Sequence, residues 1–203
     1  MMQAAQPSLI LASGSTARQA LMAAAGLLFE TQVALVDEAE AKRAARAEGL
    51  DADEAALMLA ELKARRVARS NPDALVIGCD QLLVCDGVWF DKPTDRDSAR
   101  AQLQALRGRT HTLESAVLCQ RGMQRVWHHI AHPRLTMRKF SDAFLENYLD
   151  AEGTAVTTSV GGYRLEGLGQ HLFDRIEGEH AAILGLPMLA LLGFLRQHAI
   201  LAQ

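Results

Sequence analysis

The segment VIGCDQLLVCDGVWFDKP, from Val76 to Pro93, decides the class of fold because it joins two strand signals through a turn signal. Its first apolar run is typical of a buried strand and reaches a carboxylate at Asp80, which we expect at the strand end. The Asp86-Gly87 pair then favours a two-residue hairpin between residues 82–85 and 88–90. A buried carboxylate is costly unless it is paired, hydrogen-bonded or bound to a metal, so Asp80 predicts a partner or a ligand at this place.

The chain before this segment begins as an α/β protein does, with an apolar run, a turn of small residues and a helical pattern. The expected elements are a strand at residues 8–12, a helix at 16–25 ended by Gly26, a strand at 29–36, helical structure at 39–69 with a break near Gly49, and a strand at 74–79. The pattern therefore predicts a mixed sheet flanked by helices.

The chain after the hairpin alternates between helical and strand patterns. Lys92-Pro93-Thr94 opens a helix, and we expect Thr94 to be its N-cap. The further expected elements are the end of this helix near Gly108, strands at 110–119 and 126–137, a short helix at 141–149, a strand at 171–178, and a C-terminal amphipathic helix within 185–201 with Pro187 at its first position.

The composition is that of an ordinary soluble globular protein. The 203 residues are 49% apolar and 22% charged, and the formal net charge is −3, which does not indicate a nucleic-acid-binding surface. We expect no membrane partner and a cytoplasmic location, since the chain shows neither a signal-peptide pattern nor a long apolar span. Its three cysteines, an odd number without zinc-like spacing, are expected to be reduced structural thiols.

The segment SGSTAR, Ser13 to Arg18, lies where a strand pattern gives way to a helix pattern. Free backbone N–H groups at a helix start, with the hydroxyls of Ser13 and Ser15 and the Arg18 guanidinium, can bind a phosphate. The alternative is that Ser15 only caps the helix. The segment is not a P-loop, because the glycine spacing and the Lys-Ser/Thr pair are absent.

Carboxylates and lysines follow other apolar runs. Asp37, Glu38 and Asp80 together offer the oxygen ligands that Mg²⁺ prefers, and one of them can take a proton from an attacking water; the alternative for Asp37-Glu38 is a solvated helix start. Lys63 is ordinarily explained as a helix-surface lysine. Lys92 precedes a proline in a tight connection, so its side chain is better placed to face a phosphate. There it would neutralise the charge that builds up on a leaving pyrophosphate.

The histidine segment His128, His129 and His132 has a metal-like HHxxH spacing, but we reject a metal site there. On a strand these residues do not share one face, and no carboxylate is interleaved. A histidine-bearing surface strand is the better interpretation. Trp89 and Trp127 are expected to pack in the core, although a tryptophan at a cleft rim can stack on a base.

Taken in order, these segments resemble the Maf family of nucleoside triphosphate pyrophosphatases. The similar pieces are LASGSTARQALM, VDE, LKA, GCDQ, DKP, LRGRTHT, GYRLEGLGQHLFDRIEG and LGLP. The resemblance covers nearly the whole chain and implies a single domain over residues 1–203, with an elongated twisted mixed sheet and two lobes around a deep cleft. It also implies a homodimer and the cleavage of a nucleoside triphosphate to monophosphate and pyrophosphate with Mg²⁺ or Mn²⁺.

The resemblance also implies roles for individual residues. Asp80 would activate the attacking water, and Glu38 and Asp80 would hold the metal. The phosphate contacts would come from Ser13, Ser15, Arg18, Lys63 and Lys92.

One branch of the family, the 7-methyl-GTP pyrophosphatases, is favoured by Gln81 and Glu166. A glutamate can accept hydrogen bonds from the guanine edge and offset the charge of the methylated ring. That branch carries Pro-Trp where this chain has Thr16 and Ala17, so a stacking platform for the base is missing at Ala17.

Two other functions compete with this interpretation. The first is a nucleotide-binding regulator of cell division or septum formation with little turnover. The second is a phosphatase that removes only the γ-phosphate, which the absence of a P-loop disfavours.

Overall fold

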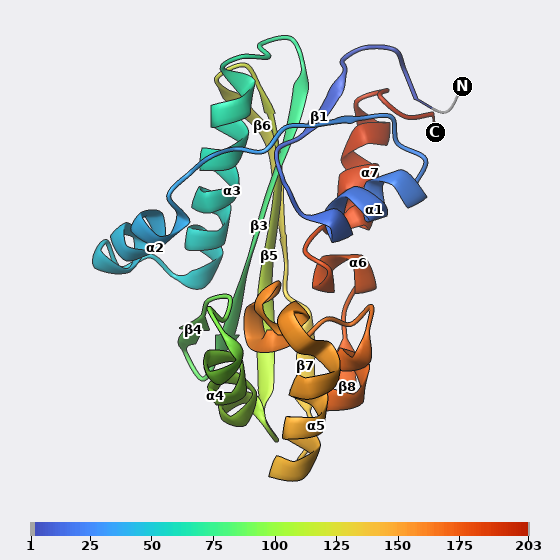
Figure 1. Cartoon of the computed structure of the whole chain (residues 1–203). Helices are drawn as coiled ribbons and strands as arrows, with labels where there is room; N and C mark the ends of the chain where they lie inside the picture. The colour runs from blue at the N-terminus through green and yellow to red at the C-terminus, as the bar shows by residue number, and fades with distance from the viewer. Residues whose placement is uncertain (1–2, 203) are drawn as a thin grey trace. The chain divides into compact units, whose positions relative to one another are not determined.

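The structure is a computed structural model that describes residues 3–202, and in that range it is a mixed α/β fold (Figure 1). Eight strands form one mixed sheet that is not closed, in the order β2-β1-β3-β5-β7-β8, with β4 beside β3 and β6 beside β5. The strands are β1 (Leu9–Leu11), β2 (Glu30–Thr31), β3 (Leu75–Cys85), β4 (Val88–Phe90), β5 (Thr110–Arg121), β6 (Gln124–Ala131), β7 (Arg134–Met137) and β8 (Phe173–Glu177). The expected fold class is confirmed.

The described residues also form seven α-helices and three short 3-10 helices. The α-helices are α1 (Thr16–Ala24), α2 (Glu38–Ala47), α3 (Ala52–Ala68), α4 (Arg96–Leu106), α5 (Asp142–Glu152), α6 (His180–Ile183) and α7 (Met188–Gln197); the 3-10 helices are η1 (Gly153–Thr157), η2 (Val160–Gly162) and η3 (Leu168–Leu172). None of the helices in the described range combines the length and the hydropathy that a membrane crossing requires.

The chain divides into two compact units. Unit 1 contains the chain up to Gln81, the segment Ser115–Ala131 and the chain from Glu179 onward; unit 2 contains Leu82–Glu114 and His132–Gly178. The strands β3 and β5 each contribute residues to both units.

Unit 1 is built on the parallel strands β1, β2 and β3, with Ile10 opposite both Glu30 and Val76. One face of β3 joins a hydrophobic core with residues of α1 and α7, while α3 covers the other face (Figure 1). Gly78 explains the close approach of α3, because a Cβ atom there would lie 2.4 Å from the Ala60 carbonyl oxygen. Trp127 packs as expected, stacked on Phe194 of α7 with ring centroids 4.9 Å apart.

The hairpin expected at Asp86-Gly87 is confirmed between β3 and β4. Asp86 and Gly87 have φ angles of 48° and 78°, as a two-residue turn with both central residues in the left-handed region requires. The expected strand end at Asp80 is wrong, since β3 runs on from Leu75 to Cys85. The expected strand at 29–36 shrinks to Glu30–Thr31, because only this part pairs with β1.

Two helix starts differ from expectation. Asp95 caps α4 in place of Thr94, because its carboxylate accepts a hydrogen bond from the Ser98 N–H at 2.7 Å and completes a capping box. The C-terminal helix expected within 185–201 is α7, but Pro187 is its N-cap instead of its first residue; the short helix α6 lies before this range.

Unit 2 encloses a buried pair of aromatic residues. His111 Nε2 lies 2.7 Å from the Tyr163 hydroxyl, and no group in the described part of the chain binds its buried Nδ1. Burial lowers the pKa of His111 to about 4. Gly161, at a φ of 77°, leaves room for the Tyr163 ring and for Leu83, both within 2.7 Å of where a Cβ atom would lie.

Candidate active site

Asp80 is the carboxylate that the sequence singled out, and it is 4% exposed on β3. Its Oδ1 accepts a hydrogen bond from Lys63 Nζ at 2.5 Å, and the same Nζ lies 2.8 Å from Oε1 of Glu38. Asp80 follows Gly78 on the same face of β3, so the close approach of α3 at Gly78 brings Lys63 to it. Side chains from β3, α3 and the first turn of α2 thus meet at one ammonium group.

Lys63 is not the surface lysine that its helical context suggests. It is 8% exposed, and burial by itself would lower the pKa of its ammonium group. The charges of Asp80 and Glu38 and their hydrogen bonds outweigh that effect, so the pKa of Lys63 lies above its ordinary value. Lys63 is therefore a cation at neutral pH, and it lies between the carboxyl groups of Glu38 and Asp80.

The donor set fits a hard divalent cation. Glu38 and Asp80 offer carboxylate oxygens, the ligands that such ions prefer, and they already converge on one positive charge. Asp37 has a different role: its carboxylate caps α2 by accepting from the Glu40 N–H at 2.9 Å, as the helix-start alternative predicted. The metal-binding roles of Glu38 and Asp80 stay predictions.

The segment SGSTAR spans the turn from β1 into α1. Ser15 caps the helix by accepting from the Arg18 N–H, which confirms the capping alternative. Ser13 is buried, and its hydroxyl oxygen accepts from the Ser15 N–H and from Arg18 Nη1, both at 3.3 Å. Ala17 is half-buried in the first turn of α1. A phosphate site here stays a prediction.

The Arg18 guanidinium is held in place by backbone carbonyl groups. Its Nε donates to the Gly185 carbonyl at 2.8 Å and its Nη1 to the Cys79 carbonyl at 3.1 Å. Nη2 donates to no group among residues 3–202, so it is the part of Arg18 that remains available to an anion. The fixed orientation favours anion binding, because little side-chain freedom remains to be lost.

Gln81 binds protein groups with its amide nitrogen. Nε2 lies 2.7 Å from Ser115 Oγ and 3.0 and 3.1 Å from the carbonyl oxygens of Ala182 and Ile183. Sequence reasoning missed Ser115, which is fully buried in β5 between Glu114 and the apolar run Ala116–Cys119. A small polar residue directly before such a run was the only signal that could have found it, since buried polar groups require partners.

Lys92 and Glu166 belong to unit 2. Lys92 is exposed in the connection between β4 and α4, before the buried Pro93. Glu166 is exposed in the segment between η2 and η3. A joint action of these two residues with Asp80 of unit 1 stays a prediction.

The segment that carries Glu166 is fastened by Glu152, which sequence reasoning missed. The side chain of Glu152 is almost fully buried, with Oε2 at 2.9 Å from Arg164 Nη2 and Oε1 accepting from the Leu168 N–H at 3.1 Å. Its hydrogen bonds to Arg164 are the largest cause of the raised pKa of that guanidinium. Glu152 therefore fixes both sides of the turn that presents Glu166.

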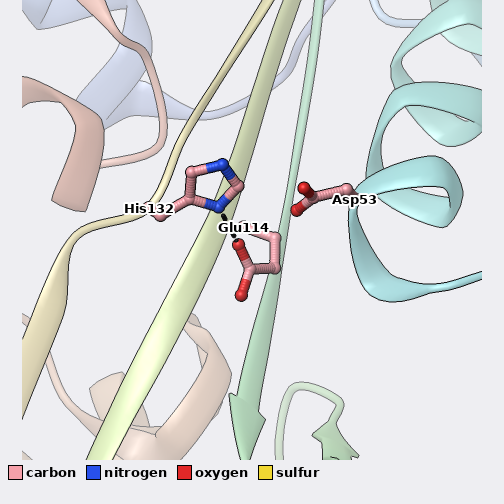
Figure 2. Close-up of side chains that lie close together, drawn as sticks. All are labelled: Asp53, Glu114 and His132. Atoms are coloured by element: carbon pink, nitrogen blue, oxygen red, sulfur yellow. Dashed lines mark hydrogen bonds and ion pairs between the residues drawn. The ribbon is translucent and has the colours of Figure 1, made fainter.

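His132 has a carboxylate partner that the spacing of the histidines did not reveal. Figure 2 shows its ring beside Glu114, with Nδ1 at 2.5 Å from Oε2, while Thr112 donates to the other oxygen of Glu114 at 2.7 Å. Asp53 of α3, drawn in the same figure, belongs to unit 1. His128 and His129 are exposed on β6, as expected for a surface strand. The partner of His132 comes from β5 and lies far from it in sequence.

The cysteines match their expected state. Cys79, Cys85 and Cys119 are all free thiols and all buried. Burial raises the pKa of Cys119 and, as the largest cause, also that of Cys85, which makes both poor nucleophiles.

Comparisons with known proteins identify the family of this chain. Residues 8–198 match the family described as Maf-like protein. A protein of Granulibacter bethesdensis named nucleoside triphosphate pyrophosphatase is 55% identical over 95% of this chain and 98% of its own length. One of Paramagnetospirillum magneticum with the same name is 56% identical over 93% of this chain and 97% of its own. A Rhizobium meliloti protein named 7-methyl-GTP pyrophosphatase is 45% identical, with coverages of 95% and 96%. Because the family match spans most of the chain and relatives this similar align over nearly their full lengths, the chain belongs to the Maf family.

Proposed function

We propose that this protein is a nucleoside triphosphate pyrophosphatase, a hydrolase that cleaves the bond between the α- and β-phosphates. The observation that carries the proposal is the buried Asp80 carboxylate in contact with the Lys63 ammonium, which in turn contacts Glu38. The names of the similar proteins support the same reaction. Product identity separates it from a γ-phosphatase, which would release orthophosphate.

In the proposed mechanism Asp80 accepts a proton from a water molecule as the water oxygen bonds to the α-phosphorus. The bond from the α-phosphorus to its bridging oxygen breaks, and pyrophosphate leaves with the electron pair. Lys63 stays protonated and offsets negative charge that develops on the phosphates. A divalent cation held by Glu38 and Asp80 would neutralise further charge and lower the pKa of the attacking water.

Substrate contacts follow from the same arrangement. The free Nη2 of Arg18, the Ser13 hydroxyl and the N-terminus of α1 offer donors to the triphosphate. We extend the proposal to Lys92 as a phosphate contact and to Glu166 as an acceptor for the guanine edge. The name of the Rhizobium meliloti relative supports 7-methyl-GTP as the preferred substrate, with Mg²⁺ or Mn²⁺ as cofactor. The family resemblance supports a homodimer in the cytoplasm. The molar mass of the purified chain, measured by light scattering, tests the dimer.

The test is pyrophosphate release from 7-methyl-GTP, GTP, UTP, dTTP and CTP, with and without Mg²⁺ or Mn²⁺. We expect Asp80→Asn to lower turnover by about 10²- to 10⁴-fold, the usual worth of a general base. Asp174→Asn, a change of an exposed carboxylate in β8, is the matched control and should keep full activity. Tight nucleotide binding without turnover would contradict the proposal and favour the regulator of cell division.

A further inference from the structure

Gln81 and Asp80 are neighbours on β3, but their side chains lie on opposite faces of the sheet. Side chains alternate along a strand, and here Asp80 meets α3 whereas Gln81 meets Ser115 and the end of α6. The side chain of Gln81 is thus directed away from the Glu38–Lys63–Asp80 cluster. Its place in the site calls for a role other than contact with that cluster.

The hydrogen bonds of Gln81 set the orientation of its amide group. Carbonyl oxygens of Ala182 and Ile183 can only accept, so the nitrogen of the amide must face them. Ser115 donates its one hydroxyl proton to the Ala182 carbonyl at 2.8 Å and therefore accepts from Gln81. The Gly185 N–H already donates to the Ala182 carbonyl at 3.0 Å, so these two side chains add to the backbone capping at the end of α6.

Arg18 fastens the same turn at a second point. It donates to the Gly185 carbonyl with Nε and to the Cys79 carbonyl with Nη1. Gly185 has a φ of 93°, and a Cβ atom there would lie 3.0 Å from Arg18 Nε, so this contact requires a glycine. Both neighbours of Asp80 are therefore tied to the turn Ala182–Gly185. The carbonyl group of Cys79 is linked to it through Arg18, and the side chain of Gln81 binds it directly.

We propose that Gln81, with Ser115, is a positioning residue that fastens the turn Ala182–Gly185 to β3 and so holds Asp80 in line with Lys63. This role rests on the proposed function and differs from the expectation that Gln81 contacts the base. A positioning residue affects the chemical step of every triphosphate alike. A residue that reads the base changes the preference among triphosphates.

The first test separates these two roles by kinetics. Gln81→Met keeps the length of the side chain and removes its donors, and Ser115→Ala removes the second member of the pair without touching Gln81. For both variants we expect kcat to fall about tenfold for 7-methyl-GTP, GTP and UTP alike, with KM changed less than about twofold. Gln102→Met is the control, because Gln102 also donates to a carbonyl group, that of Asp91, outside this cluster.

The second test is independent of turnover. Amide hydrogen exchange over residues 182–186 should be faster in both variants than in the native protein and unchanged in Gln102→Met. If the native protein releases no pyrophosphate, the proposed function fails while this measurement still decides whether the turn is fastened. Unchanged exchange in both variants, or a shift of more than about threefold in the preference for 7-methyl-GTP over GTP, overturns the proposal.

Discussion

The ion pair between Lys63 and Asp80 should be a major determinant of stability as well as of activity. Both side chains are at least nine-tenths buried, so removal of one leaves the other charge with little solvent. Breaking such a buried pair typically costs about 3–5 kcal/mol. We expect Lys63→Met at the upper end of this range, because it leaves two carboxylates facing each other, and Asp80→Asn below it, because Glu38 still pairs with Lys63.

The double variant provides the sharper number. Once Lys63 and Asp80 are both neutral, neither charge is stranded, so we expect the cost to fall short of the sum of the single variants by about 2–3 kcal/mol. The pKa of Lys63 is raised in the folded state. Its contribution to the free energy of unfolding is therefore complete below its unfolded-state pKa and is lost only as the pH rises through its folded-state pKa. Measurements at pH 7 therefore report the full interaction.

The assay is urea denaturation of the native protein, the two single variants and the double variant, with unfolding free energies from linear extrapolation. Arg175→Met, which removes an exposed ion pair to Glu177, is the control and should change stability by no more than about 0.5 kcal/mol. Additivity of the two changes within about 0.5 kcal/mol would refute the reasoning, since it would mean that the two charges do not interact.

Two further predictions concern burial and close packing. The buried, neutral His111 should make the protein acid-sensitive, because its pKa of about 4 in the folded state lies below its pKa of about 6.5 in the unfolded chain. Its contribution to the free energy of unfolding is therefore complete above about pH 6.5, and that free energy falls by about 2–3 kcal/mol by pH 4.5. Urea midpoints at pH 7 and 4.5 check this, and His111→Gln should lose that part of the pH dependence. Gly78→Ala should lower the stability by about 1–3 kcal/mol and also lower turnover, because the added methyl group would collide with the Ala60 carbonyl and push α3, with Lys63, away from Asp80. Thermal unfolding and pyrophosphate release measure the two effects. A variant with native stability would show that α3 does not pack as closely as described.

Local features of the fold were predictable from the sequence because they depend on a few adjacent residues. The Asp86-Gly87 turn needs two residues that tolerate positive φ, and the hydroxyls of Ser15 and Ser141 cap helices by accepting from N–H groups three residues later. The break near Gly49 between α2 and α3 is of the same kind. The order of the site segments along the chain also sufficed to indicate the family.

Other features depend on partners far away in the chain, and these only the tertiary structure decided. The burial of Lys63 requires Asp80, 17 positions later, and Gln81 owes its orientation to Ala182, 101 positions later. The continuation of β3 past Asp80 is of this kind as well, since a buried carboxylate is tolerated mid-strand only when a cation such as Lys63 pairs with it. Propensity and periodicity describe a residue and its near neighbours, whereas the free energy of a buried polar group is set by whatever the fold places against it.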